Sequence, residues 1–305
     1  DDDILPAISL DHIVELGPGA GALTDKLVET YGAQKLQCIE IDERSVELLS
    51  EKHPELDILH QDVLQVDYPQ LAEQAQQPLV VIGNLPYYIT SQILFALADA
   101  SHVGAIECAT VTMQWEVGQR MVAPTCTKDY GILSVVFQLY ANVNCHFKIP
   151  PTVFYPQPKV DSALLGLHFV GPSTLRKRLA GVDPVQLRRV VTTAFQQRRK
   201  TIRNSLKKIS REVCHGDADA ATALWQQEAP ALPASVQELV PSDPVCAQQQ
   251  LPSDWAAKRP EELTPGQFVE LTRLLYGPHE ELATAELQST PLPIKVWRKL
   301  KHGSN

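Results

Sequence analysis

Apolar and polar positions follow a regular order through the first 170 residues of the chain. Short apolar runs occur near residues 13, 36, 56, 79, 106 and 164, and stretches with helical spacing follow several of them. Short apolar runs bounded by turn residues are typical of buried strands, and their alternation with helices is typical of a parallel sheet. The pattern therefore predicts a doubly wound α/β domain for residues 1–170.

The chain beyond residue 170 lacks comparable strand runs. It contains an apolar stripe at helical spacing, formed by Leu187, Val190, Val191, Ala194 and Phe195. We therefore expect a smaller, all-helical domain over residues 171–305. Within it, residues 212–256 are rich in Ala, Gln, Pro and Asp, which predicts a loop or a partly disordered segment.

A glycine-rich turn follows the first predicted strand. Gly17, Gly19 and Gly21 precede a helix that is expected to begin near Ala22. Glycine permits unusual backbone angles and a close approach of a ligand, and a helix N-terminus offers N–H groups to polar or anionic ligands. The spacing also fits the loose dinucleotide fingerprint, so the turn alone indicates a nucleotide-type ligand without saying which one.

Acidic side chains follow the second and third predicted strands. Glu40 lies 23 residues after Gly17, near the position where a ribose-binding acid is expected. Asp42 competes for this role, since either acid could instead cap the helix that follows. Asp62 could accept a hydrogen bond from an adenine amino group, or it could be a plain helix cap.

Asn84, Leu85, Pro86 and Tyr87 follow the fourth predicted strand, Leu79–Ile82. The amino nitrogen of a base is a poor nucleophile, because its lone pair is delocalised into the ring. A site that methylates it must hold the NH2 group with acceptors and grip the flat base. Asn84 offers a side-chain oxygen, Pro86 stiffens the turn and Tyr87 offers a stacking face. Alone, the stretch could simply close a buried strand; with the glycine turn, it predicts methyl transfer to an exocyclic amine.

These motifs, in this order, resemble those of the small-subunit ribosomal RNA adenine N6,N6-dimethyltransferases. Further matches are Gly83, the segment from Val153 to Ser162 and the segment from Ala194 to Leu206; the resemblance covers residues 11–211 and again 259–268. It implies a Rossmann-like class I methyltransferase fold with S-adenosylmethionine as the cofactor. It also implies N6,N6-dimethylation of adjacent adenosines near the 3′ end of small-subunit rRNA, with the small ribosomal subunit as the partner. Relative to the family, residues 212–256 are an insertion.

The resemblance implies a role for each matching residue. Glu40 would hold the ribose of the cofactor, Ile41 and Val63 the faces of its adenine, and Asp62 the amino group. The full set of cofactor-binding residues would be Glu15, Gly17, Gly19, Gly21, Glu40, Ile41, Asp62, Val63 and Asn84. The target adenine would lie against the turn of Asn84, Leu85, Pro86 and Tyr87, with Phe154 closing its other face, although Phe154 could also be part of the core. No metal is required, because the methyl group is already activated and the enzyme mainly positions the reactants.

One family motif has no counterpart here. The family carries a short Asn-Phe-Leu-type motif before the glycine turn, which helps to hold the methionine end of the cofactor, and residues Asp1–Pro6 do not match it. We expect that the natural protein begins earlier than this sequence.

Charge is distributed unevenly. The net charge of −9 alone argues against a nucleic-acid partner, but residues 171–211 contain 12 basic residues and one acidic residue, whereas residues 1–170 contain 8 basic and 22 acidic residues. The basic block predicts contacts with RNA phosphates. The expected contact residues are Arg188, Arg189, Arg198, Arg199, Lys200, Arg203, Lys207 and Lys208. Some of them could instead form a solvated helix face.

Composition adds a few expectations about the setting. The six cysteines have no metal-ligand spacing, which predicts buried thiols in a reducing compartment. No run has transmembrane length and no signal peptide is visible. We expect a monomer in the bacterial cytoplasm, with a mitochondrion or plastid as the alternative. Residues 291–301 form a basic tail without an assigned role.

Two other functions fit part of the pattern. A non-catalytic relative could serve as a ribosome-assembly or organellar transcription factor on the same fold. A nicotinamide-dependent oxidoreductase could use the glycine turn. The oxidoreductase is disfavoured, because hydride transfer has no use for the Asn84–Tyr87 stretch or for a basic block.

Overall fold

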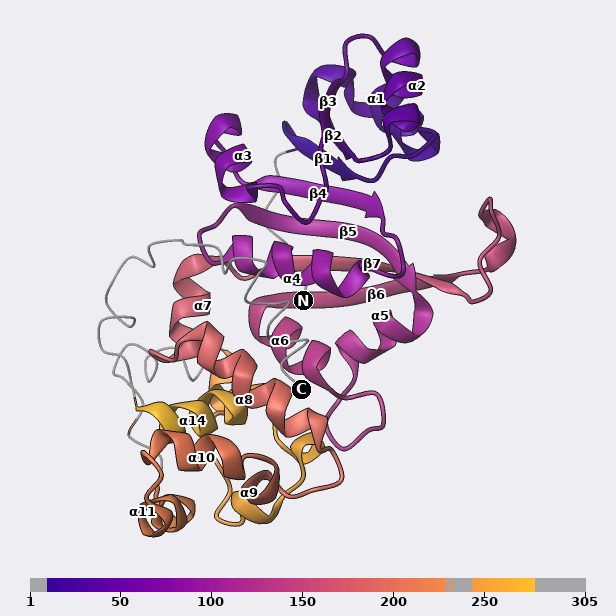
Figure 1. Cartoon of the computed structure of the whole chain (residues 1–305). Coiled ribbons are helices and arrows are strands. Elements are labelled where there is room, and N and C mark those ends of the chain that lie inside the picture. The colour runs from indigo at the N-terminus through magenta and orange to yellow at the C-terminus, as the bar shows by residue number, and fades with distance from the viewer. Residues whose placement is uncertain (1–9, 229–230, 232–242, 278–305) are drawn as a thin grey trace. The chain divides into compact units, whose positions relative to one another are not determined.

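The computed structural model describes residues 10–228, 231 and 243–277. They form two compact units, which we describe separately (Figure 1). The first contains residues 10–118 and 142–171, and the second contains residues 119–141 and the described residues from 172 onward. The expected boundary at residue 170 lies close to the point, after Gly171, where the described chain leaves the first unit for the second. Residues 119–141, however, also belong to the second unit. That these units are independent domains stays a prediction.

A seven-stranded sheet forms the centre of the first unit, in the order β3-β2-β1-β4-β5-β7-β6. The strands are β1 (Ile13–Leu16), β2 (Leu36–Glu40), β3 (Asp57–His60), β4 (Leu79–Asn84), β5 (Ile106–Gln114), β6 (Ala141–Ile149) and β7 (Ser162–Phe169). β1 to β5 are parallel and β7 is antiparallel to β5. The six predicted strands are confirmed. β6 was missed because its apolar residues alternate with polar ones and form no continuous run.

The helices of this unit follow from the crossovers between strands. They are α1 (Ala22–Tyr31), η1 (Ala33–Lys35), α2 (Glu43–Lys52), α3 (Tyr68–Ala75), α4 (Thr90–Ser101) and η2 (Pro151–Val153), and α5 (Trp115–Val122) follows β5. Such crossovers are right-handed, so α1 and α2 cover one face of the sheet and α3 and α4 the other. As the spacing predicts, Leu23, Leu27 and Val28 of α1 pack on the core formed with Ile13 and Cys38.

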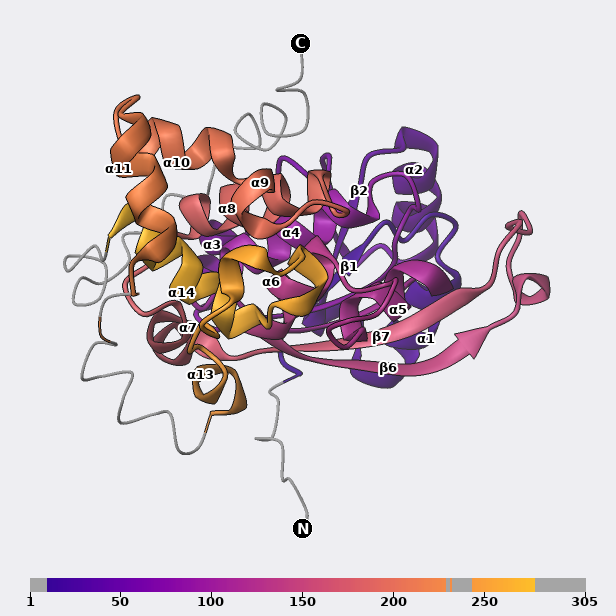
Figure 2. The ribbon, with the colours of Figure 1, turned by 90° about the horizontal axis from the view of Figure 1, so that it is seen from below.

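The winding reverses between β1 and β4, which are neighbours in the sheet. In open α/β sheets, ligands bind at this point, beyond the carboxyl ends of the strands. Because β7 runs antiparallel, it begins at the same edge, and its first residue, Ser162, lies opposite Gln114 at the end of β5. The connection from β6 to β7 extends away from the rest of the sheet in both views (Figures 1 and 2).

The described part of the second unit is helical. Its elements are α6 (Ile132–Tyr140), α7 (Gly171–Leu179), α8 (Pro184–Gln196), α9 (Ile202–Ser205), α10 (Lys207–Val213), α11 (Ala218–Ala223), η3 (Leu224–Gln226), α13 (Pro244–Ala247), η4 (Trp255–Ala257), η5 (Pro260–Glu262) and α14 (Pro265–Tyr276). The predicted stripe is confirmed on α8, whose Leu187, Val190, Val191 and Ala194 are fully buried. Phe195 completes it by packing between Tyr130 and Phe268, with ring centroids 6.0 and 5.8 Å away.

The described parts of residues 212–256 are more ordered than a loop, since they form α11, η3, α13 and η4. Asp243 caps α13 by accepting hydrogen bonds from the backbone N–H groups of Val245 and Cys246. The same carboxylate pairs with Arg178 at 2.8 Å, and both side chains are 7% exposed. A buried ion pair therefore fixes this segment to α7.

Three findings concern the setting. All six cysteines lie among the described residues and none is in a disulfide, but Cys126 is exposed, so the expectation of buried thiols is wrong there. No helix in the described part is long and apolar enough to cross a membrane. The unmatched stretch Asp1–Pro6 and the basic tail at 291–301 lie outside the described residues.

Candidate active site

The glycine turn leaves its backbone open to a ligand. Gly17 and Gly19 have φ angles of 66° and 54°, and a Cβ atom added to either would meet nothing within 4 Å. The positive φ angles explain why glycine is needed there, and the open space allows a ligand to approach the backbone. Gly21 differs, because an added Cβ would lie 2.7 Å from Leu49. Its glycine is explained both by its φ angle of 84° and by the packing of α1 on α2, and its predicted contact with a cofactor stays a prediction.

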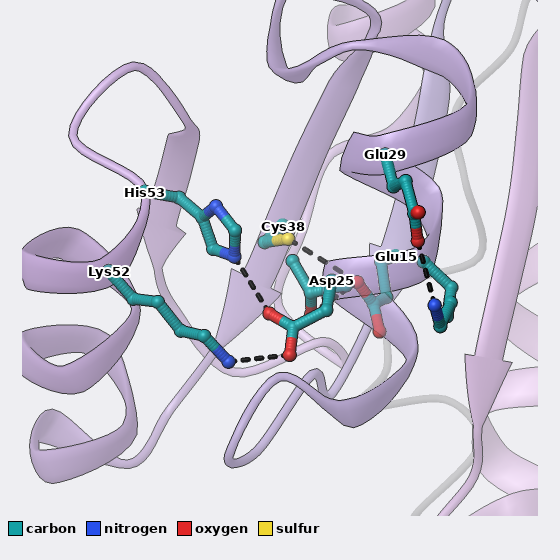
Figure 3. Close-up of polar contacts among 8 residues, drawn as sticks. Glu15, Asp25, Glu29, Cys38, Lys52 and His53 are labelled. Atoms are coloured by element: carbon teal, nitrogen blue, oxygen red, sulfur yellow. Dashed lines mark hydrogen bonds and ion pairs between the residues drawn. The ribbon is translucent and has the colours of Figure 1, made fainter.

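Glu15 makes buried contacts with the elements next to the glycine turn (Figure 3). Its carboxylate is 1% exposed and accepts hydrogen bonds from Thr24 at 2.8 Å and from the Cys38 thiol at 3.6 Å. Burial raises the pKa of Glu15, and the Thr24 and Cys38 hydrogen bonds only partly oppose this. The structure thus gives Glu15 a role in joining β1, β2 and α1, and direct contact with a cofactor stays a prediction.

Asp25 joins the two helices that flank this turn. Figure 3 shows its carboxylate bonded to Lys52 and His53, at 2.5 and 2.8 Å. Hydrogen bonds from Lys52 and then from His53 lower the pKa of Asp25. The first turn of α1 is therefore tied to the end of α2.

The two candidates for the ribose-binding acid, Glu40 and Asp42, make different contacts, and the ribose contact itself stays a prediction. Asp42 is the N-cap of α2 and accepts from the backbone N–H of Arg44. Glu40 instead turns back to the glycine turn, where it accepts from the N–H of Gly19 at 3.0 Å and from the N–H groups of Ile41 and Asp42 at 2.8 and 2.9 Å. A carboxylate has about four acceptor sites, so Glu40 can accept one further donor at the edge of the sheet.

The remaining predicted cofactor residues lie just after β2 and β3. Ile41 is 63% exposed, which is high for a large apolar side chain at a strand end and suits a platform for a flat ligand. Asp62 accepts from the N–H of Leu64, so it does cap a turn, and Val63 accepts from the buried Tyr68 hydroxyl through its carbonyl. The adenine contacts of these residues stay predictions.

The Asn84 turn is held by its neighbours in the sheet. Gly83 lies so close to β1 that an added Cβ would be 2.6 Å from the carbonyl oxygen of Leu16. Leu85 is 2% exposed and anchors the turn in the core, whereas Asn84 is exposed. The Thr112 hydroxyl donates to the side-chain oxygen of Asn84. Sequence reasoning missed Thr112, because only the pairing of β4 with β5 brings it opposite Asn84.

Tyr87 is fixed by the last strand of the sheet in chain order. Its hydroxyl is 2.6 Å from the hydroxyl of Ser162 at the start of β7. The ring is thereby held at the same edge as Asn84. Phe154 lies in the connection that leads to Ser162 and is partly exposed, so it is not plain core. Its contact with a target base stays a prediction.

The predicted RNA-contacting residues fall into two groups. Arg199, Lys200, Arg203, Lys207 and Lys208 are exposed. Arg188 is 1% exposed, so the structure does not place it where a phosphate would reach it. Arg189 pairs with Glu212 and donates to Tyr276, and Arg198 donates to the carbonyls of Thr127 and Lys128. These last two guanidinium groups hold the helical unit together.

Two surface grooves of about 580 and 620 Å³ border the exposed basic group. Both are lined by Asn204, Lys207 and Arg211. Arg211 was absent from the predicted contacts, although it lies one helical turn after Lys207 and therefore on the same face of α10. In the described part of the chain, no group of three or more His, Cys, Asp or Glu residues could hold a metal ion.

Comparison with known families gives one long match. The model of the ribosomal RNA adenine dimethylase family matches residues 4–222. Two relatives, both described as ribosomal RNA small subunit methyltransferase A, are similar in sequence. The one from Salinibacter ruber is 41% identical over 267 residues, 87% of this chain and 75% of the relative. The one from Chlorobium chlorochromatii is 42% identical over 199 residues, 65% of this chain and 71% of the relative.

Two solved structures share the fold. A dimethyladenosine transferase from Plasmodium falciparum has a TM-score of 0.63 and 23% identity, covering 88% of this chain and 92% of its own. The 23S rRNA methyltransferase ErmE has a TM-score of 0.51 and 23% identity, covering 88% of this chain and 93% of its own. Both agree with the Rossmann-like sheet described above.

Proposed function

Because the chain belongs to the ribosomal RNA adenine dimethylase family, and so is an rRNA adenine dimethyltransferase, we propose that it acts on small-subunit rRNA. In this proposal, it transfers methyl groups from S-adenosylmethionine to the N6 atoms of adjacent adenosines near the 3′ end. The names of the relatives from Salinibacter and Chlorobium support the choice of subunit. The proposal rests mainly on one observation. The Asn84 turn and the glycine turn follow neighbouring strands, β4 and β1, and lie at the same edge of the sheet.

The residues at this edge suit the proposed cofactor. Gly17 and Gly19 offer open backbone, Glu40 has room for one further hydrogen bond, and Ile41 offers an exposed apolar face. Gly17, Gly19 and Glu40 would hold the methionine and ribose portions, and Ile41, Asp62 and Val63 the adenine. When bound there, S-adenosylmethionine supplies a methyl group that is already activated by its sulfonium.

The chain's own residues then hold the amine in place. An amide oxygen has two lone pairs, and Thr112 uses one of those on Asn84. The other would accept a hydrogen bond from the N6 amino group of the target adenine. Tyr87, anchored by Ser162, would stack on the base, and Phe154 would close its other face. Alignment of nitrogen and methyl is the main catalytic contribution of such a site.

The test is transfer of labelled methyl groups to small ribosomal subunits that lack the modification, followed by nucleoside analysis. We expect N6,N6-dimethyladenosine with the natural sequence. Asn84→Ala should bind the subunits but give no product, because the amine is no longer held. Large subunits serve as the control substrate. Unchanged turnover by Asn84→Ala, or methylation of large subunits only, would contradict the proposal.

We extend the proposal to the setting of the reaction. The protein would act as a monomer on the small ribosomal subunit, through the exposed basic residues Arg199, Lys200, Arg203, Lys207 and Lys208. The bacterial relatives support a bacterial cytoplasm, with a mitochondrion or plastid as the alternative. Gel filtration with light scattering tests the oligomeric state, and a mass of two chains would contradict a monomer.

A further inference from the structure

The groove of about 580 Å³ in the helical unit has two chemically different walls. One wall carries Arg203 of α9 together with Lys207 and Arg211 of α10, and all three side chains are exposed. Among the described residues, none of these three forms an ion pair, in contrast to Arg189 and Arg198. Three positive charges therefore line the groove, and no Asp or Glu is among the described residues that line it.

The rest of the groove is lined in part by an aromatic ring and by small side chains. Trp225 of η3 lines the groove and is half-buried. Its indole lies against Trp255, which is 6% exposed, with ring centroids 5.6 Å apart at an interplanar angle of 45°. Trp255 covers part of Trp225 and restricts its movement. Ala256 and Ala257, which have small side chains, line the same groove.

The elements that form the groove are neighbours in the fold. Figures 1 and 2 show α9, α10 and α11 side by side, and η3 follows α11 directly. The N–H of Ile202 in α9 donates to the carbonyl of Lys258 at 2.8 Å, which fixes η4 beside the basic wall. This hydrogen bond joins α9, which carries Arg203, to the segment that carries Ala256 and Ala257.

We propose that this groove binds one unpaired nucleotide of the RNA substrate, with the base stacked on Trp225 and the phosphates on Arg203, Lys207 and Arg211. A volume of about 580 Å³ is within the range of small-ligand sites. Cations beside an aromatic face are the combination that single-stranded nucleic acids recognise, since the charges hold the backbone and the ring stacks on any base. The groove is separate from the Asn84 turn, so it is a second RNA contact. It rests on the proposed function only in that the partner is RNA.

RNA fits this groove better than an acidic peptide does. An acidic peptide would use the three cations but would gain little from the indole face. The chain as a whole carries a net charge of −9, so a polyanion is repelled from most of its surface and attracted to this wall. Trp225 and Trp255 both lie beyond residue 222, where the match to the family model ends. The family model therefore does not cover the aromatic part of the groove.

The test compares two labelled, unstructured RNA hexamers with equal numbers of phosphates, one with bases and one abasic, by fluorescence anisotropy without cofactor. We expect the base-bearing hexamer to bind about tenfold more tightly, as stacking of one base predicts. Trp225→Ala should lower this ratio several-fold, because the stacking face in the groove is lost, and Trp225→Phe should keep most of it. Lys207→Ala should weaken both hexamers equally, whereas the matched control Lys26→Ala, an exposed lysine of α1, should change neither.

A second pair of variants leaves both tryptophans in place. Ala257 is exposed in the groove, so Ala257→Glu should fold normally. It should weaken binding of the base-bearing hexamer about tenfold, because it places a negative charge among the cations. Ala257→Gln, which adds no charge, should bind this hexamer better than Ala257→Glu does. An unchanged ratio in Trp225→Ala, equal binding by the two Ala257 variants, or tighter binding of polyglutamate than of RNA would overturn the proposal. Methyl transfer to small subunits is measured separately with the unsubstituted protein, so a failure of the proposed reaction is distinguishable from a failure of this site.

Discussion

The hydroxyl of Thr112 donates a hydrogen bond to the side-chain oxygen of Asn84, and the two residues are direct partners in the register of β4 and β5. A strand residue thereby sets which way the amide of the exposed Asn84 points. With the amide reversed, the Thr112 hydroxyl would have to accept from the NH2 group instead of donating to the oxygen. Orientation of the amide is what the proposed reaction needs, because only the oxygen can accept from the target amine.

Thr112→Val should therefore slow methyl transfer without affecting cofactor binding. The change removes the donor and keeps the side-chain shape, so we expect kcat to fall about five- to tenfold, as the loss of one hydrogen bond implies. Thr112→Ser keeps a hydroxyl and should retain most of the activity. The measurement is steady-state methyl transfer to small subunits. A kcat equal to that of the natural sequence in Thr112→Val would show that Asn84 is oriented by something else.

Substitution of Glu40 should weaken ligand binding, whereas substitution of Asp42 should lower the stability of α2. Glu40→Gln places an NH2 group toward backbone donors that now bind a carboxylate, so affinity for S-adenosylhomocysteine should fall about tenfold or more. Asp42→Ala removes only the cap of α2 and should cost about 1 kcal/mol of stability. Thermal melting with and without S-adenosylhomocysteine measures both effects, and NAD should shift neither protein. A ligand shift lost in Asp42→Ala but kept in Glu40→Gln would reverse the two assignments.

Some residues of the basic block should contribute to the stability of the fold and others to RNA binding. Arg198→Ala removes donors to the carbonyls of Thr127 and Lys128 and an ion pair with Glu261 at 3.7 Å. We expect it to cost about 1–3 kcal/mol of stability and to leave the salt dependence of RNA binding nearly unchanged.

The double variant of Arg199 and Lys200 to Ala should have the opposite effect. Both residues are exposed, so melting should change little, while the slope of log affinity against log salt should decrease by about 2. Binding titrations at several salt concentrations measure the slope. Equal slopes in this variant and in the natural sequence would exclude these two residues as phosphate contacts.

The buried pair of Arg178 and Asp243 should contribute a pH-dependent part of the stability. Burial alone would raise the pKa of Asp243, but the hydrogen bond from Arg178 and those from the N–H groups of Cys246 and Val245 lower it overall. A carboxyl with a lowered pKa stabilises the fold above its unfolded pKa of about 3.9, and this contribution is lost as pH falls through the lower folded value.

Asp243→Asn should remove this contribution and leave Arg178 without its charge partner. We expect a loss of about 3–5 kcal/mol at neutral pH, as for other broken buried pairs, and a smaller decrease in stability below pH 4 than in the natural sequence. Urea unfolding at several pH values tests this. The surface pair of Lys26 and Glu29, with side chains 75% and 68% exposed, provides a control whose removal should cost little.

The sequence predicted the features that depend on local patterns. Apolar runs located six of the seven strands, and the glycine turn, Glu40 and the Asn84 stretch were expected where the structure places them. The missed features depend on contacts between distant residues. Thr112 reaches Asn84 across 28 positions and Ser162 reaches Tyr87 across 75, and no local pattern reports such pairings.

The basic block shows a different limit of sequence reasoning. Composition correctly marked it as a concentration of charge, but the eight expected contacts included Arg188, which is buried, and Arg189 and Arg198, which bond within the protein. A guanidinium group can serve a core or a surface equally well. Only the packing of α8 with its neighbours decides which role each arginine has.

The contact between Tyr87 and Ser162 bears on when the enzyme becomes functional during synthesis. β7 is made last of the seven strands, yet it lies between β5 and β6 in the sheet. A nascent chain that has reached Tyr87 already contains the residues of the glycine turn, but the tyrosine ring still lacks its anchor, Ser162. Folding during translation generally proceeds from the N-terminus. The proposed grip on the target base would therefore be complete only after β7 has been inserted, and a chain that ends before Ser162 lacks the anchor of Tyr87.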